Sequence, residues 1–149
     1  MSWMPATDFA LGDKQSCDVL DLIIVPRVRG LGDGFSVRRA LPHSRRQMVF
    51  IFFDQMGPVQ FVAGQGLDVR PHPHIGLATV TYLLDGRVMH RDSEGNALEI
   101  TPGAMNIMTA GRGIAHSERS PLSARRGIEG LFGIQSWIAL PQAHEPPGE

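Results

Sequence analysis

The sequence has little cysteine and almost no lysine. Its 149 residues include one cysteine, Cys17, so no disulfide bond can form within the chain. This composition fits a reducing compartment. Lys14 is the one lysine among 14 basic residues, and with 15 acidic residues the formal net charge is -1. Such a balanced chain carries no general signal for direct binding to nucleic acid or to an anionic membrane surface.

Long apolar segments are also absent. No run approaches the roughly 20 apolar residues that a membrane-spanning helix requires. The opening stretch MSWMPATDFALGDKQSCD lacks a basic segment followed by an apolar one, so no signal peptide is visible. We therefore expect a cytoplasmic protein outside the membrane. The sequence also lacks a Ser-His-Asp arrangement, a phosphate-binding glycine loop and a Cys-x-x-Cys motif, which leaves a metal ion as the visible source of chemistry.

Glycine and proline are abundant, at 17 and 11 residues, and they divide the chain into short segments rich in β-branched and aromatic residues. Strands at roughly eight- to twelve-residue spacing favour an antiparallel sandwich or barrel. No alternation of strands and helices is visible, so we expect an all-β fold. The predicted strands are 18–25, 47–58, 77–85, 87–92, 97–100, 104–110, 114–120 and 133–140. Segment 30–42 is predicted to start with a glycine-rich turn and to continue into a short strand.

Three turns have clear sequence signals. Asp85-Gly86 predicts a hairpin between strands 77–85 and 87–92. Ser93 to Asn96 predicts a second turn, and Gly57-Pro58 is expected to end the strand that precedes it.

Two pairs of polar residues recur with the same two-residue spacing, namely His72 with His74 and His116 with Glu118. Residues i and i+2 of a strand point to the same face, so each pair shares one face of its strand. If both faces line a barrel, four ligand atoms suited to a first-row metal can converge. Spacing alone leaves a second interpretation open, in which the residues are half-exposed polar groups on two strands.

Other residues near these pairs have two interpretations each. His90 can line the pocket or have a structural or exposed role, and Asp92 is expected in a turn or at a strand edge. Trp137 can border the cavity or pack in the core.

The segments HPHIGLATVTYLLDG, HRDSEGN, TPG, MTAGRGIAHSE and GIQSWIALP, in this order, resemble the N-terminal half of the pirin family within the cupin superfamily. The resemblance implies a cupin-type antiparallel β-barrel, also called a double-stranded β-helix or jelly roll. It implies that His72, His74, His116 and Glu118 bind one divalent metal ion. Iron, as Fe(II), is the usual ion, and Zn, Ni, Cu or Mn can occupy such a site.

The resemblance also implies the candidate functions. One is a quercetin 2,3-dioxygenase activity on a small aromatic flavonol, with Glu118 as the catalytic residue that accepts a hydroxyl proton. Another is a non-enzymatic, iron-binding and redox-responsive regulatory module that contacts a transcription factor or a metabolic enzyme as its protein partner. A third is a storage or scaffold barrel with no chemistry at the site.

The chain departs from the family pattern in two respects. Ile75, Leu77 and Ala78 stand where family members often carry arginine, an aromatic residue and glutamate. Ala78 in particular replaces a carboxylate expected on the strand face of His72 and His74. Typical family members also have two cupin domains, so we expect one domain at 20–141, an N-terminal segment at 1–19 and a flexible tail at 142–149. An apolar face left without a second barrel predicts a homodimer.

Overall fold

The computed structural model describes residues 24–32, 35–41 and 50–140. These residues form ten strands and one short 3-10 helix, η1 (Ala124–Arg126). Every strand pairing among them is antiparallel, so the predicted all-β antiparallel fold is confirmed. The strands are β1 (Arg27–Gly32), β2 (Phe35–Leu41), β3 (Phe50–Phe61), β4 (Asp68–His74), β5 (Leu77–Asp85), β6 (Val88–Asp92), β7 (Ala97–Ile100), β8 (Met105–Thr109), β9 (Ile114–Arg119) and β10 (Glu129–Ala139).

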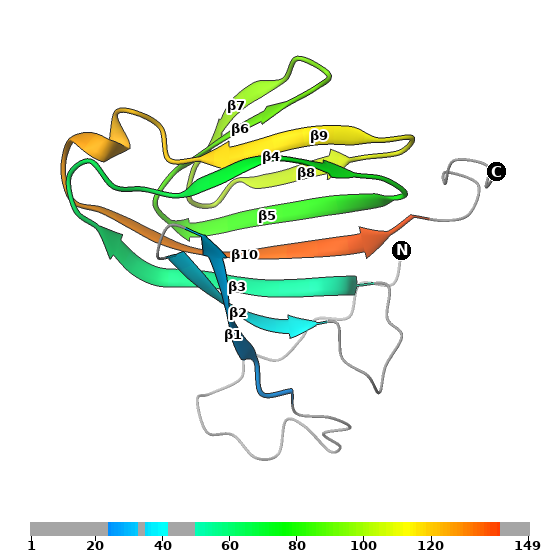
Figure 1. Cartoon of the computed structure of the whole chain (residues 1–149), viewed down its shortest axis with the longest axis horizontal. Helices are drawn as coiled ribbons and strands as arrows, with labels where there is room; N and C mark the ends of the chain where they lie inside the picture. The colour runs from blue at the N-terminus through cyan, green and yellow to red at the C-terminus, as the bar shows by residue number, and fades with distance from the viewer. Residues whose placement is uncertain (1–23, 33–34, 42–49, 141–149) are drawn as a thin grey trace, which may run out of the picture.

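The strands form two sheets. The six-stranded sheet has the order β1-β2-β3-β10-β5-β8, and the four-stranded sheet has the order β4-β9-β6-β7. In Figure 1 the long strands β3, β5 and β10 run side by side, with β4, β9, β6 and β7 beyond them. Because strands close in sequence alternate between the two sheets, residues distant in sequence face one another across the interior.

The predicted hairpin at Asp85-Gly86 is wrong. β5 pairs with β10 and β8, whereas β6 pairs with β7 and β9. The turn carries the chain from one sheet to the other, and Leu83 and Val88 on its two sides are both buried in the core. Gly86 has a φ of 82° and packs against the backbone of Gly130, so this crossover has no room for a side chain.

The strand that contains Gly57-Pro58 continues past this pair, contrary to the sequence prediction. β10 pairs with β3 on both sides of it, at Met56 opposite Gly133 and at Val59 opposite Leu131. Gly57 and Pro58 form a bulge between these two pairings, which the positive φ of Gly57 permits. The Gly57-Pro58 pair, which predicted a turn, therefore lies within a long strand.

The glycine-rich turn expected at the start of 30–42 is wrong at Gly30 to Gly32, which belong to β1, whereas the short strand expected after it is β2. The remaining strand predictions differ mainly at their ends. β6 and β7 form a hairpin across residues 93–96, closed by a hydrogen bond from the Asp92 amide to the Asn96 carbonyl at 3.1 Å, which confirms that turn. β10 begins four residues before the predicted start at Gly133. Residues 24 and 25 precede β1 without strand structure, and the rest of the strand predicted at 18–25 lies outside the described residues. So do the segments 1–19 and 142–149.

The apolar core joins both sheets. Leu83 of β5 and Leu131 of β10 pack with Val88 of β6 and Ile100 of β7, all at most 2% exposed. Further along β5 and β10 the inward-facing residues become polar, and these are the residues that contact the candidate site. None of the described residues forms a helix long and apolar enough to cross a membrane.

Candidate metal centre

Strands β4 and β9 bring the two predicted pairs of residues together. The strands are hydrogen-bonded neighbours, and His72 lies directly opposite His116. His74, His116 and Glu118 are buried, with 7%, 2% and 5% exposure. The register shifts between Val69 and His72, where β4 has one residue more than β9. This bulge sets the two histidines opposite each other.

Three imidazoles form a compact cluster. Ring nitrogens of His72, His74 and His116 lie within 4.8 Å of one another. Nε2 of His72 and Nε2 of His116 lie 3.1 Å apart. Nδ1 of His72 lies 2.9 Å from the carbonyl oxygen of Arg70, which can only accept a hydrogen bond. The proton of a neutral His72 is therefore on Nδ1, and its Nε2 lone pair faces the cluster.

Glu118 lies in a second group, which overlaps the first at His116. Atoms of His90, His116 and Glu118 also lie within 4.8 Å of one another. The structure thus places Glu118 beside His116 but does not group it with His72 and His74. The four residues expected from the sequence are divided between two groups that share one histidine.

The Glu118 carboxylate is held from the opposite sheet. Nε2 of Gln135 on β10 lies 2.9 Å from both carboxylate oxygens. The hydroxyl of Thr81 on β5 donates to Oε1 of Glu118 at 3.3 Å. These donors fix the orientation of a buried carboxylate that would otherwise be costly to desolvate.

The surroundings keep the central imidazoles neutral. Burial lowers the pKa of His116 to about 3, and the positive charges that His72, His74 and His90 would carry lower it further, against a smaller opposing effect of Asp92. Burial and the proximity of His72 also lower the pKa of His74. Only a neutral imidazole has a lone pair for a metal. The imidazoles of His72, His74 and His116 and a nearby carboxylate therefore form a donor set that fits a single first-row divalent ion.

Two further residues at the site were not assigned to it from the sequence. His90 is 2% exposed, and its Nδ1 lies 3.4 Å from Nδ1 of His116. Asp92, expected in a turn or at an edge, has a buried side chain 3.1 Å from Nε2 of His90. Burial raises the pKa of Asp92, but hydrogen bonds from Asn96, His90 and Glu94 outweigh it and lower that pKa below its usual value. The spacing of His90 and Asp92, which repeats that of the two predicted pairs, was the available signal.

Comparison with known proteins gives the family. The family model described as Pirin matches residues 34–138. This chain belongs to the pirin family. A pirin-like protein of Caulobacter vibrioides is 47% identical over 131 residues, which are 85% of this chain and 45% of that protein.

Solved structures of pirin-family and related proteins have the same fold. A quercetin 2,3-dioxygenase from Acinetobacter baumannii matches with a TM-score of 0.74 and 43% identity, over 80% of this chain and 40% of that one. The bacterial pirin YhhW of Escherichia coli, solved in complex with nickel(II), matches with a TM-score of 0.57 and 26% identity, over 76% of this chain and 48% of that one. The cupin fold expected from the resemblance is confirmed. The chain spans less than half the length of each of these proteins.

The residues that depart from the family pattern do not all lie where the sequence predicted. Ala78 lies on β5 in the six-stranded sheet, whereas His72 and His74 lie on β4 in the other sheet, so the expected shared strand face does not exist. Ile75 follows His74 directly and is 60% exposed. Trp137 both borders the cluster and packs in the core, because its ring is 4.9 Å from that of His74 and stacks on Phe52 at 4.1 Å.

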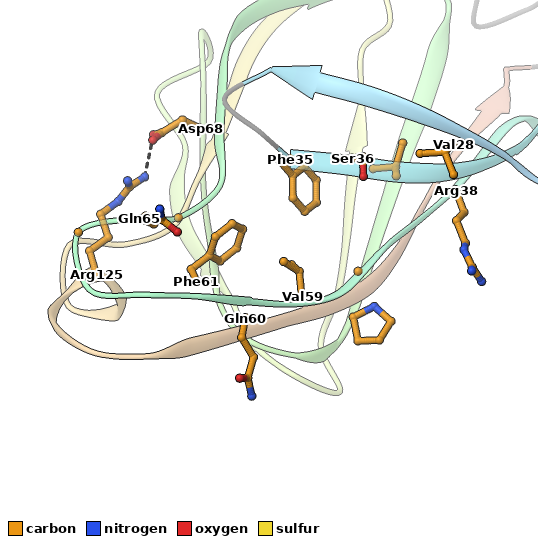
Figure 2. Close-up of a pocket in the computed structure, with 15 residues that line it drawn as sticks. Val28, Phe35, Ser36, Arg38, Val59, Gln60, Phe61, Gln65, Asp68 and Arg125 are labelled. Atoms are coloured by element: carbon orange, nitrogen blue, oxygen red, sulfur yellow. Dashed lines mark hydrogen bonds and ion pairs between the residues drawn. The ribbon is translucent and has the colours of Figure 1, made fainter.

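A separate pocket lies apart from these residues. Its volume is about 850 Å³, and none of the histidines of the cluster nor Glu118 lines it. Figure 2 shows Phe35, Phe61 and Val59 pointing into this pocket, with the ion pair of Arg125 and Asp68 at its edge. That pair is 2.7 Å apart, so the arginine is already neutralised. The groups suited to hold a metal therefore lie in the histidine cluster and not in this pocket.

Proposed function

We propose that this chain is the metal-binding cupin domain of a quercetin 2,3-dioxygenase-type oxidoreductase, with His72, His74, His116 and Glu118 as ligands. The cluster of three imidazoles within 4.8 Å carries the proposal. Glu118 would complete the set from its place beside His116. The name of the Acinetobacter baumannii structure supports a flavonol-type aromatic substrate.

We propose Fe(II) as the resident ion, with Zn, Ni, Cu or Mn as competitors for the same nitrogen and oxygen donors. The nickel complex of the Escherichia coli pirin supports occupation of such a site by a first-row ion. Once bound, the ion would polarise a substrate oxygen and supply the redox chemistry with O₂.

The residues of the chain would orient the substrate and move one proton. A flavonol carries neighbouring hydroxyl and carbonyl oxygens, which would enter beside His72 and His74. Glu118 would accept the hydroxyl proton on a carboxylate oxygen, so that the bound substrate becomes an anion. Gln135 would hold the carboxylate in place through its two hydrogen bonds. Trp137 would limit access of water from the side of His74.

The first test is elemental analysis of the purified wild-type chain beside His74→Ala and Glu118→Ala. We expect close to one first-row ion per wild-type chain and a clear loss in both variants. Unchanged metal content in both variants would refute the ligand assignment. The activity test is aerobic turnover of flavonols by protein loaded with each metal in turn, and failure with every metal would refute the dioxygenase proposal.

The regulatory module is the second candidate, and the exposed apolar side chain of Ile75 beside His74 favours it. In this proposal an iron-dependent change at the cluster alters a surface that contacts a transcription factor or metabolic enzyme. Capture of such a protein that depends on metal or redox state, without flavonol turnover, would support this candidate over the enzyme.

We also propose that the chain forms a homodimer. Met105 and Ile107 are 61% and 58% exposed, and both lie on β8 at the edge of the six-stranded sheet in the described part of the chain. An exposed apolar edge strand favours pairing with another chain. Size-exclusion chromatography with light scattering would test this, and a clean monomer at high concentration would contradict it.

A further inference from the structure

His116 is the residue that the two candidate metal groups share, and its two ring nitrogens face different partners. Nε2 faces Nε2 of His72 at 3.1 Å, and Nδ1 faces Nδ1 of His90 at 3.4 Å. A neutral imidazole has one N–H and one lone pair. The position of a single proton on His116 therefore decides which of the two groups receives its lone pair.

The far side of His90 is anchored by Asp92. Oδ2 of Asp92 lies 3.1 Å from Nε2 of His90. Oδ1 of Asp92 accepts hydrogen bonds from the backbone amides of Glu94 and Asn96, at 3.1 and 3.0 Å. The side-chain amide of Asn96 adds a donor to each carboxylate oxygen. A carboxylate surrounded by donors acts as an acceptor, so the proton of a neutral His90 is on Nε2.

The direction of the remaining hydrogen bond follows from this anchor once a cation is bound. With its proton on Nε2, His90 presents a lone pair on Nδ1 toward His116. The single N–H of a neutral His116 can donate either to this lone pair or to the Nε2 lone pair of His72, and a cation between His72 and His116 excludes the second choice. His116 then donates from Nδ1 to His90, and its own lone pair is on Nε2. This Nε2 faces the Nε2 lone pair of His72, whose proton is held by the Arg70 carbonyl. Two lone pairs that face each other at 3.1 Å repel unless a cation lies near them.

We propose that Asp92 and His90 are positioning residues that hold His116 in the Nδ1–H tautomer and thereby direct its Nε2 lone pair to the group of His72 and His74. This inference rests on the proposed metal centre, in which the His116 lone pair joins those of His72 and His74 and Glu118 completes the set from beside His116. Hydrogen bonds of this kind to a ligand's second nitrogen orient the ring and strengthen metal binding.

The strand pairing places His90 and Asp92 beside His116. β6 is paired with β9, and His90 lies opposite Glu118 while Asp92 lies opposite His116. His116 is thus flanked by His72 from β4 on one side and by the Asp92–His90 pair from β6 on the other. The hairpin turn after Asp92 supplies the donors that fix the carboxylate.

The tautomer can be observed directly in the whole chain loaded with Zn(II), which is diamagnetic. Long-range ¹H–¹⁵N correlation spectra of ¹⁵N-histidine-labelled protein distinguish Nδ1–H from Nε2–H imidazoles. We expect Nδ1–H for His116 and His72 and Nε2–H for His90. In Asp92→Asn the side-chain amide can donate to His90, so we expect a substantial Nδ1–H population at His90, which can no longer accept from His116. An Nε2–H form of His116 in the wild type would overturn the proposal.

Two substitutions of His90 separate positioning from structural support. His90→Gln keeps an amide near the position of Nε2 for Asp92 but removes the acceptor that faces His116. His90→Asn puts an amide oxygen near the position of Nδ1 and gives up the contact with Asp92. Using Zn(II) with a chromophoric competing chelator, we expect His90→Gln to weaken binding by about 10- to 100-fold and His90→Asn to stay much closer to wild type.

Each outcome of this pair decides a question. Equal or reversed losses in the two variants would overturn the positioning role. Loss of binding in both His90 variants, with full binding in His72→Ala and His74→Ala, would place the metal in the group of His90, His116 and Glu118 instead. A wild type that binds no metal would refute the proposed function, while an Nδ1–H form of His90 in the metal-free chain would separately refute its anchoring by Asp92. Amide spectra and thermal unfolding identify any variant that has lost its fold.

Discussion

The two sheets contribute to the candidate metal centre in different ways. The four-stranded sheet carries all the imidazoles of the site and the Glu118 carboxylate, on the adjacent strands β4, β9 and β6. The six-stranded sheet contributes Thr81, Gln135 and Trp137, which contact these groups from across the interior. The four-stranded sheet, called here the ligand sheet, therefore supplies the candidate ligand atoms, and the six-stranded sheet, called the supporting sheet, holds them in place.

This difference suggests that the two sheets respond differently to mutation. Loss of a ligand atom removes a bond to the metal. Loss of a donor on the opposite sheet leaves a buried carboxylate with fewer hydrogen bonds. This loss lowers the free energy of unfolding as well as the metal affinity. Substitutions at the two sheets should thus be separable by measuring metal affinity and unfolding in parallel.

The largest effect is expected for His116→Ala in the four-stranded sheet. His116 belongs to both candidate groups, so its removal disrupts the site whichever group holds the ion. We expect metal affinity to fall by more than the roughly 100-fold that marks the upper range for supporting residues. Competition with a chromophoric chelator would measure the change.

Ser117→Ala is the matched control for this substitution. Ser117 is the next residue on β9, and strand alternation directs its side chain to the opposite face. Its metal affinity should equal that of the wild type. If His116→Ala also retained wild-type affinity, the division between ligand sheet and supporting sheet would be wrong.

A different response is expected for Gln135→Leu in the six-stranded sheet. The substitution removes the donor that lies 2.9 Å from both oxygens of Glu118. We expect the free energy of unfolding of the metal-free chain to fall by about 1–3 kcal/mol, because a buried acceptor loses its partner. Urea unfolding would measure this, and the same substitution in a Glu118→Leu background should cost much less. An equal cost in both backgrounds would show that Gln135 acts through packing alone.

The ligand sheet was the more predictable of the two. Strand parity alone placed His72 with His74 and His116 with Glu118, and the paired strands β4 and β9 confirm that the two pairs are neighbours. Parity does not give the register, however. The bulge between Val69 and His72 sets His72 opposite His116. Pro71 lies in that stretch, but proline occurs in edge strands as well as in bulges, so it does not give the register.

The supporting sheet was harder to predict because its contacts depend on topology. Gln135 is 17 residues from Glu118 and Thr81 is 37 residues from it, and both reach it from the other sheet. The expected hairpin at Asp85-Gly86 would have kept β5 and β6 in one sheet, whereas the chain crosses between sheets there. His90 and Asp92 did carry a usable signal in their two-residue spacing, but their burial depends on this same crossover.

Acidification should destabilise the metal-free chain through protonation of His116, which lies in the four-stranded sheet. The pKa of His116 is about 3 in the folded state, below the value of about 6.5 expected in the unfolded chain. Between these values the unfolded chain binds the proton and the folded chain does not. The contribution to stability is therefore complete above about pH 6.5 and declines as the pH falls toward 3, by on the order of 1 kcal/mol per pH unit.

Urea unfolding of the metal-free protein at several pH values would measure this slope. His116→Asn removes the titrating group from the four-stranded sheet, so its slope between pH 6.5 and 4 should be shallower than that of the wild type. Identical slopes would contradict the pKa assignment. Gln135→Leu, on the other sheet, should keep the slope due to His116 while lowering stability at every pH.

The smallest effect is expected for Thr81→Val, which changes the supporting sheet without changing side-chain shape. Thr81 is 1% exposed, and its hydroxyl donates to Glu118 at 3.3 Å, a longer contact than those made by Gln135. We expect a loss of about 0.5–1.5 kcal/mol in the free energy of unfolding and a smaller change in metal affinity than in Gln135→Leu. Thr109→Val, at an exposed position on β8, controls for the substitution itself. A loss as large as that of Gln135→Leu would mean that the carboxylate depends on both donors together, so that the supporting sheet acts as a connected network and not through one dominant residue.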